Sequence, residues 1–107
     1  MKELKFKHEL AKKILSGEKT TTWRLFDDKD LTEGDEVVFV DSDTGNEFAR
    51  VRLVKIDEQR LGEMREEDFL GHEKYESVEE MLETFKRYYG DGVNLESVVK
   101  VVRFVVV

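Results

Sequence analysis

The last ten residues of the chain, 98–107, restrict its fold more than any other segment. They contain seven valines and a phenylalanine, and only Lys100 and Arg103 interrupt the apolar run. Valine and phenylalanine favour strands. Because apolar residues fall on both faces of such a strand, we expect a central strand that is covered on each side. An edge strand that pairs between subunits is the alternative, so the expected state is a monomer or a weak homodimer.

Four earlier segments have the patterns of further strands. Residues 36–56 look like a hairpin, in which the turn-forming residues 41–46 join two strand-like runs. The alternation of apolar and polar residues slips at Leu53 and Val54, where a β-bulge can absorb the extra residue. The expected strands before residue 98 are 2–7, 19–24, 36–40 and 47–56.

Three segments are expected to be helical. Residues 78–89 place apolar side chains on one face, begin after Ser77 with the S-x-x-E pattern of a capping box, and end at Gly90. Shorter helices are expected over 8–16, which Gly17 would end in a left-handed conformation, and over 61–69. The length of 107 residues suits a single domain over 1–107. We expect an α+β fold, a small and mostly antiparallel β-barrel of about five to six strands with about three flanking helices.

The composition argues against several kinds of site. There is no cysteine, and His8 and His72 are the only histidines, so we expect neither a metal site nor a cofactor. No apolar run approaches the length of a membrane span, and the first residues lack the apolar core of a signal peptide. We therefore expect a cytoplasmic domain without membrane contacts. Separately, we expect His72 to lie in an exposed loop.

Charged residues make up 40% of the chain and are unevenly distributed. Residues 1–24 carry a net charge of +4, whereas the whole chain carries −7. One basic region on an acidic protein favours a small binding footprint or a single nucleotide over a long duplex. Glutamate and lysine supply 27 residues and asparagine and glutamine only three, a bias typical of thermophiles, although the chain has no proline.

Residues 16–24 contain most of the groups that can do chemistry. They follow the first expected helix and read Ser-Gly-Glu-Lys-Thr-Thr-Thr-Trp-Arg. Along a strand, Thr22 and Arg24 share one face and Lys19 points to the other. Lys19 and Thr22 can therefore act together only if Lys19 lies in a non-extended turn just after Gly17, and the glycine favours such a turn.

This segment resembles the G-x-K-x-x-T-x-R motif of the ASCH domain family. The residues that match the motif are Gly17, Lys19, Thr22 and Arg24. A T-x-G-D turn at 32–35 and a tyrosine-glycine helix end at 88–90 extend the likeness over nearly the whole chain. The resemblance implies a PUA-like barrel with a cleft that binds RNA or a nucleotide.

A subgroup of small bacterial members of this family hydrolyses the amide of N4-acetylcytidine. The resemblance implies that the lysine and the threonine of the motif, together with a glutamate before the last helix, form the catalytic site. The corresponding residues here are Lys19, Thr22 and Glu73. Glu76 is an alternative to Glu73, because the alignment of this loop depends on a gap.

Amide hydrolysis needs a nucleophile, a base that activates it and a donor to the leaving amine. A threonine hydroxyl is inert until a neighbour accepts its proton, and a lysine does so only if its pKa falls from about 10.4 to roughly 7–8. Burial and the charge of Arg24 lower the pKa of Lys19, whereas Glu73 raises it. Lys19 is thus a candidate base or oxyanion donor, and Glu73 a proton carrier or a ligand of the substrate amine.

Further residues are candidates for binding a nucleoside or RNA. Arg24 can bind a phosphate or a base carbonyl, or instead pair with an aspartate of the loop 27–30. Trp23 can stack on a base, but its place opposite Thr22 favours the core. Arg50 and Arg52 share one strand face, which either extends a phosphate-binding surface or pairs with carboxylates. The binding candidates are Thr20, Trp23, Arg24, Arg50 and Arg52.

The ligand expected from these features is RNA, a nucleoside or a nucleotide. A reading from another functional class is a non-catalytic module that senses a ligand in its pocket or presents its acidic surface to a protein. In both readings Lys2, Lys5 and Lys7 are expected on the solvated side of the first strand.

Overall fold

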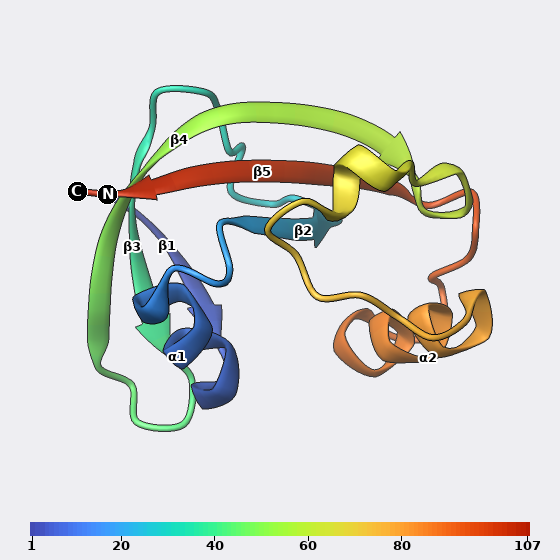
Figure 1. The fold of residues 1–107 in the computed structure, drawn as a ribbon, viewed down its shortest axis with the longest axis horizontal. Helices are drawn as coiled ribbons and strands as arrows, with labels where there is room; N and C mark the ends of the chain where they lie inside the picture. The colour runs from blue at the N-terminus through green and yellow to red at the C-terminus, as the bar shows by residue number, and fades with distance from the viewer.

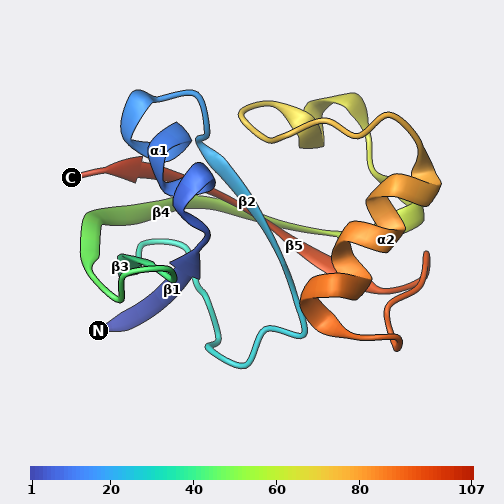
Figure 2. The same cartoon turned by 90° about the horizontal axis from the view of Figure 1, so that it is seen from below.

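A computed structural model describes residues 1–107 and shows a five-stranded sheet with two α-helices packed against it (Figure 1). The elements in chain order are β1 (Lys2–Phe6), α1 (His8–Ser16), β2 (Thr21–Leu25), β3 (Glu36–Asp41), β4 (Glu47–Arg60), α2 (Val78–Tyr89) and β5 (Val98–Val106). Seen from below, β2 crosses between the two helices (Figure 2). No helix is both long and apolar enough to cross a membrane.

The valine-rich segment is an interior strand, as its two apolar faces predict. The strand order is β1-β3-β4-β5-β2, so β5 pairs on both sides and the edge-strand alternative is wrong. Val99, Val101 and Val102 are fully buried. Burial of a valine stabilises a fold by roughly 1.5–3 kcal/mol relative to exposure, and an edge position would forfeit part of this energy.

The sheet is an open, curled half-barrel, which corrects the expected closed and mostly antiparallel barrel. β1 pairs with β3 in parallel, and the other three pairings are antiparallel. No ladder joins the two edge strands, β1 and β2. A side chain bridges them instead, because Nη2 of Arg24 on β2 donates a hydrogen bond of 3.1 Å to the carbonyl of Lys5 on β1.

The bulge expected in the second hairpin strand is present. The register between β4 and β5 shifts between Leu53 and Lys55, so that Leu53 is fully buried while Val54 points to solvent. β4 continues to Arg60, four residues beyond the expected end of this strand, because its pairing with β5 continues as far as Val98. The irregular pairing helps the two long strands to bend, as bulges generally do.

Two of the three expected helices are confirmed, with their caps. α1 ends at Gly17, whose φ of 84° is left-handed and whose N–H donates to the carbonyl of Ile14. α2 begins after Ser77, whose hydroxyl accepts the N–H of Glu80 at 3.1 Å. These caps satisfy backbone groups that the helix ends leave without partners.

The prediction of a third helix, over 61–69, is wrong. The segment forms two short 3₁₀ turns, Leu61–Glu63 and Glu66–Phe69. The N–H of Leu61 donates to the carbonyl of Ser97, and the buried carboxylate of Asp68 accepts the N–H of Arg65 at 2.8 Å. A continuous helix would need the N–H of Arg65 for its own carbonyl at Leu61, whereas the N–H of Leu61 would be one of its four free donors in any case. The bond from Arg65 to Asp68 therefore competes with the helix, and the bond from Leu61 ties the segment to Ser97.

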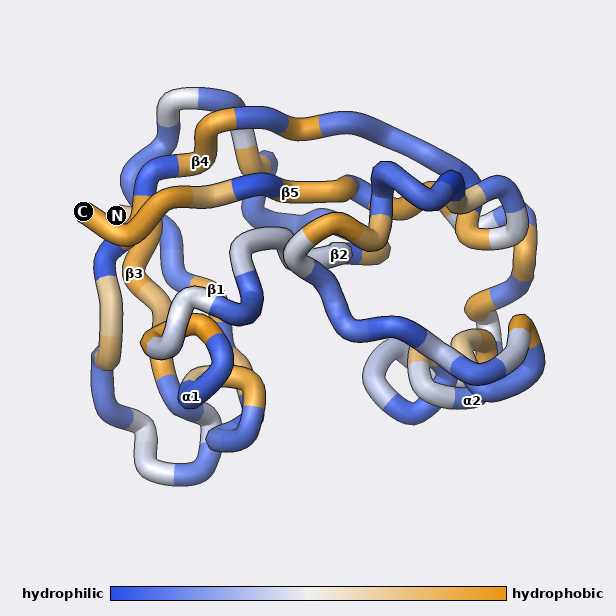
Figure 3. The backbone as a smooth tube through the Cα atoms, viewed as in Figure 1, coloured by the Kyte–Doolittle hydropathy of each residue, from blue (hydrophilic) through white to orange (hydrophobic).

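Two hydrophobic cores lie along the sheet. The first packs around Phe39 under α1, and the second packs around Trp23 and Phe85 under α2. β5 contributes to both of them, which fits its almost continuous apolar colour in Figure 3. The two helices stand apart at opposite ends of the sheet (Figure 1), and the candidate site lies between the two cores.

Candidate functional site

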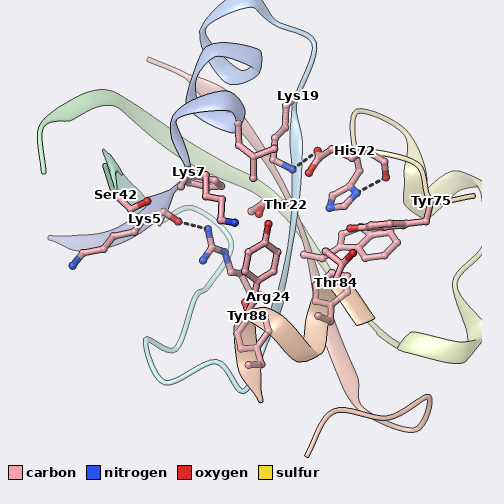
Figure 4. Close-up of a pocket in the computed structure, with 16 residues that line it drawn as sticks. Lys5, Lys7, Lys19, Thr22, Arg24, Ser42, His72, Tyr75, Thr84 and Tyr88 are labelled. Carbon is pink, nitrogen blue, oxygen red and sulfur yellow. Dashed lines mark hydrogen bonds and ion pairs between the residues drawn. The ribbon is translucent and has the colours of Figure 1, made fainter. Parts of the chain in front are cut away.

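A cleft of about 460 Å³ opens between the two cores (Figure 4). Its lining comes from β1, the start of α1, β2, the segment 72–75 and α2. Of the sequence candidates, the structure brings five into this lining: Lys19, Thr22, Trp23, Arg24 and Glu73.

Lys19 reaches the cleft because of the turn that follows α1. The left-handed Gly17 reverses the chain, and the N–H of Lys19 donates to the carbonyl of Lys13 at 3.0 Å. The turn itself covers Gly17 and Glu18, and Lys19 follows it directly, two residues before β2 begins. The turn brings Lys19 into the same cleft lining as Thr22. Its side chain is almost completely buried, with 3% of the residue exposed.

The Lys19 ammonium is held by a carboxylate and a carbonyl. Its Nζ donates to Oε2 of Glu73 at 2.7 Å and to the carbonyl of Thr21 at 2.9 Å. Burial lowers the pKa of Lys19, and the Glu73 carboxylate opposes this effect only in part. Burial is the largest single influence on the pKa of Glu73 and raises it, but the charge of Lys19, together with His72 and the hydrogen bonds to the carboxylate, makes the net shift downward. Lys19 and Glu73 therefore form an ion pair of an ammonium and a carboxylate. The alternative carboxylate, Glu76, lies exposed outside the cleft.

The position of Glu73 depends on a close contact between its loop and the start of β2. The carbonyl of Gly71 accepts the N–H groups of Thr20 and Thr21 at 2.9 and 3.1 Å, and the Thr21 hydroxyl donates to Leu70. Gly71 has a φ of +74°, and a Cβ placed on it would lie 2.0 Å from Oγ1 of Thr20. Thr20 therefore anchors the loop and lies outside the cleft lining.

The hydroxyl of Thr22 makes no hydrogen bond within the protein. Although the residue is only 4% exposed, its oxygen is not among the fully shielded atoms that lack a partner, so it reaches the cleft. Thr22 pairs with Val102 in the sheet and lines the cleft together with Lys19 (Figure 4). A hydroxyl in this position can attack a bound electrophile without first breaking a hydrogen bond to the protein.

His72 lies in the cleft, which corrects the expected exposed loop residue. Its ring stacks on Trp23 with centroids 4.2 Å apart and planes 14° apart. Nδ1 lies 2.8 Å from the Glu73 carbonyl, and because a carbonyl only accepts, Nδ1 carries the proton. Burial, aided by the charge of Lys19, lowers the pKa of His72 to about 4. The ring is therefore neutral near pH 7, and Figure 4 shows its other nitrogen, an acceptor, on the cleft side.

His72 makes stability sensitive to mild acid. Its pKa of about 4 lies below the ordinary histidine value of 6.5, so the unfolded chain binds its proton first, and stability is lost as pH falls from 6.5 towards 4. We expect wild-type protein to lose on the order of 2 kcal/mol through this group between pH 7 and pH 4.5. Urea unfolding at both pH values measures the loss. The His72→Phe variant keeps an aromatic ring on Trp23, and its loss of unfolding free energy between the two pH values should be smaller than that of the wild type by this amount. An identical loss in both proteins would contradict the low pKa of His72.

Trp23 belongs to the second core, which agrees with the prediction from its position on the strand face opposite Thr22. Only 3% of it is exposed, its ring packs against Phe69 and Phe85, and its Nε1 donates to the carbonyl of Asp68 at 3.1 Å. It supports the wall of the cleft and holds His72 in place.

Arg24 lies in the cleft and forms no ion pair with the loop 27–30. Its guanidinium lies 4.6 Å from the ring centroid of Phe6. Asp27, the nearest of the candidate partners in sequence, pairs instead with Lys100 on β5, at 2.7 Å between Nζ and Oδ2. Lys100 also donates to the carbonyl of Leu31, so the loop closes on β5 and leaves Arg24 without a carboxylate.

Arg50 and Arg52 lie outside the cleft, and both are exposed. Arg52 pairs with Glu36 across the hairpin at 3.5 Å, and Arg50 lies 4.0 Å from Glu47. Of the two alternatives for this arginine pair, the structure therefore selects pairing with nearby carboxylates.

Several lining residues were not among the site candidates from the sequence. Tyr88 and Tyr89 at the end of α2 and Tyr75 in the loop before it contribute aromatic surface. Lys5 and Lys7 line the cleft as well, whereas Lys2 pairs with Asp35 at 2.7 Å. Alternation along β1 separates these lysines from its apolar residues, but it cannot show that a cleft opens beside them.

Comparison with known proteins identifies the fold. No family model and no curated protein matches the sequence. Solved structures do: a DUF984 protein from Enterococcus faecalis V583 is 20% identical, with 92% of this chain and 70% of that chain covered and a TM-score of 0.76. An ASCH domain from Lactobacillus crispatus JV V101 is 14% identical over 98% and 79% of the two chains, with a TM-score of 0.73. A protein from Pyrococcus furiosus is 22% identical over 99% and 96%, with a TM-score of 0.68.

The chain therefore has an ASCH-like fold. The fold agrees with the resemblance that the motif at 17–24 indicates.

Proposed function

We propose that this protein binds a modified nucleoside, free or within RNA, in its cleft and hydrolyses an N-acyl amide on the base, with N4-acetylcytidine as the model substrate. One observation carries the proposal: the buried pair of Lys19 and Glu73 shares a cleft with the unbonded hydroxyl of Thr22. The ASCH-like fold and the complete motif support it. The volume of about 460 Å³ is in the range of small-molecule sites.

The reaction we propose proceeds in two steps. Oγ of Thr22 attacks the acyl carbon, its proton passes to the Glu73 carboxylate, and the Lys19 ammonium stabilises the oxyanion. The carbon–nitrogen bond breaks, and the exocyclic amine leaves with the proton from Glu73. Water then hydrolyses the ester on Thr22, which releases the carboxylic acid and regenerates the hydroxyl. The sum is amide plus water giving amine plus acid.

The downward pKa shift keeps the Glu73 carboxylate ionised at neutral pH, so it is free to accept a proton. The same shift makes it a weaker base than a carboxylate whose pKa lies near 7, so the scheme relies on its position beside Lys19. With Lys19 held at 2.7 Å from it, the site keeps the donor for the oxyanion and the proton acceptor together before substrate arrives. Such preorganisation lowers the barrier without rearrangement during the reaction.

Release of cytidine from N4-acetylcytidine, followed by chromatography at ambient and elevated temperature, tests the proposal. We expect turnover by the wild type and a loss of about 10²–10³-fold in kcat/KM for Lys19→Met, which removes the ammonium and keeps most of the stem. Lys12→Met, an equal charge change at an exposed position of α1, should leave turnover unchanged. Circular dichroism confirms that each variant is folded.

Two results would count against the enzymatic proposal. Turnover that Lys19→Met leaves intact would place the reaction elsewhere. Binding of N4-acetylcytidine without any turnover by folded wild-type protein would favour the ligand-sensing alternative.

A further inference from the structure

The cleft is positively charged although the protein is acidic. The cations Lys7, Lys19 and Arg24 and the carboxylate of Glu73 line it, in a chain whose net charge is −7. Glu73 neutralises Lys19, and the remaining cations are Lys7 and Arg24. Neither of these two forms an ion pair with a carboxylate, although carboxylates outnumber cations in the chain. Charge of one sign gathered in a concave site attracts ligands of the opposite sign.

Arg24 has an unused hydrogen-bond donor at this end of the cleft. Nε of Arg24 is shielded from solvent and has no partner, while Nη2 donates to the carbonyl of Lys5. A buried donor without a partner destabilises a fold by roughly 1–3 kcal/mol, so natural sites that keep one usually offer it to a ligand. Burial lowers the pKa of Arg24, but a guanidinium remains charged under all ordinary conditions.

Lys7 lines the same cleft as Arg24. Its Nζ lies 5.0 Å from the ring centroid of Tyr88, and Figure 4 shows it directed towards Arg24, whereas the side chain of Lys5 extends away from the cleft. A planar guanidinium and a mobile ammonium together match the oxygen atoms of a phosphate group.

The two ends of the cleft are separated by a distance that suits a nucleotide. Thr22 and Arg24 are two residues apart on β2, which is about 6–7 Å along a strand. Lys19 and His72 lie at the Thr22 end in Figure 4, where Glu73 accepts the bond from Lys19, and Lys7 lies at the Arg24 end. A base whose acyl group is at Thr22 would therefore direct its sugar and phosphate towards Arg24.

We infer that Arg24 and Lys7 form a phosphate subsite, so that the cleft selects a phosphorylated cytidine, either a mononucleotide or a residue of RNA, over the free nucleoside. This inference rests on the proposed function for the placement of the base. The subsite itself follows from the unpaired cations.

Isothermal titration with cytidine, cytidine 5′-monophosphate, cytidine 3′-monophosphate, a short cytidine-containing RNA and inorganic phosphate, at low and high salt, tests the inference. We expect at least one monophosphate to bind about tenfold or more tightly than cytidine, with an affinity that falls as salt rises. Arg24→Gln and Lys7→Gln should each remove most of this advantage, measured as the ratio of monophosphate to cytidine affinity. Because Lys7 is exposed, its variant stays informative if Arg24→Gln unfolds. Arg60→Gln, an exposed residue paired with Glu96, is the matched control.

The outcomes separate the subsite from the proposed function. Equal affinities for cytidine and both monophosphates would overturn the subsite and leave amide hydrolysis intact. Inorganic phosphate that binds the wild type and not Lys7→Gln would support the subsite even if no nucleoside is turned over. Tight RNA binding with weak monophosphate binding would assign the phosphate to a polynucleotide, and tight monophosphate binding would assign it to a free nucleotide.

Discussion

The Thr22→Val variant is expected to lose about 10⁴-fold or more in kcat for N4-acetylcytidine while binding it within about threefold of the wild type. Valine has nearly the shape of threonine and lacks only the hydroxyl that the proposed reaction uses as nucleophile. The hydroxyl bonds to nothing in the protein, so its removal leaves no partner unsatisfied and the fold should persist or gain slightly in stability. Single-turnover kinetics and a binding titration separate the two effects.

Thr22→Ser provides the complementary test. Serine keeps the hydroxyl and loses the methyl group that helps to orient it, so this variant should retain turnover within about tenfold of the wild type. Accumulation of an acylated Thr22, seen by mass spectrometry after rapid acid quenching, would give direct evidence for the ester. If Thr22→Val turns substrate over at the wild-type rate, water attacks the amide directly and the nucleophile is not Thr22.

The Gly71→Ala variant is expected to lower the free energy of unfolding by about 3 kcal/mol. A φ of +74° disfavours any residue with a Cβ by roughly 1–2 kcal/mol. The added Cβ would also lie 2.0 Å from Oγ1 and 3.2 Å from Cβ of Thr20, and such overpacking adds roughly 1–3 kcal/mol. Rotation of the Thr20 side chain can move Oγ1, but its Cβ at 3.2 Å and its N at 3.3 Å stay close as long as the 2.9 Å bond from its N–H to the Gly71 carbonyl is kept.

Gly45→Ala isolates the backbone contribution to this effect. Gly45 has a φ of +77° and open space where a Cβ would stand, so we expect a loss of only about 1 kcal/mol. Urea unfolding of both variants gives the comparison. Gly71→Ala should also reduce turnover, because the loop that carries Glu73 to Lys19 must shift. Equal stabilities of the two alanine variants would show that the contact with Thr20 is not close in solution.

The elements with strong local patterns were predictable. Ser77 and the apolar stripe after it predict α2, Gly17 predicts the end of α1, and the run of valines predicts an interior β5. Each signal depends on groups within one or two turns of helix, or along one strand. The helix predicted over 61–69 is absent. Its apolar residues have helical spacing, but its backbone forms hydrogen bonds to Ser97 and to the side chain of Asp68, and the spacing does not reveal these partners.

The candidate site divides in the same way. Lys19, Thr22 and Arg24 lie within six residues of one another, so their relative positions follow from one helix cap and one strand. Glu73 came from a resemblance, with Glu76 as its alternative, and only the bond between Gly71 and the start of β2 decides between them. Nothing local marks His72, because its low pKa depends on its stacking against Trp23 and its distance from water.

The amino-acid sequence alone is thus sufficient for the interior strand, the two capped helices, the absence of thiolates and the spacing of the motif, because these depend on residue chemistry and on chain geometry over short distances. The open edge between β1 and β2, the parallel pairing of β1 with β3 and the placement of Lys7 in the same cleft as Arg24 depend on the tertiary structure. They arise from contacts between segments far apart in the chain, whose free energies compete with one another and leave no periodic pattern in the sequence.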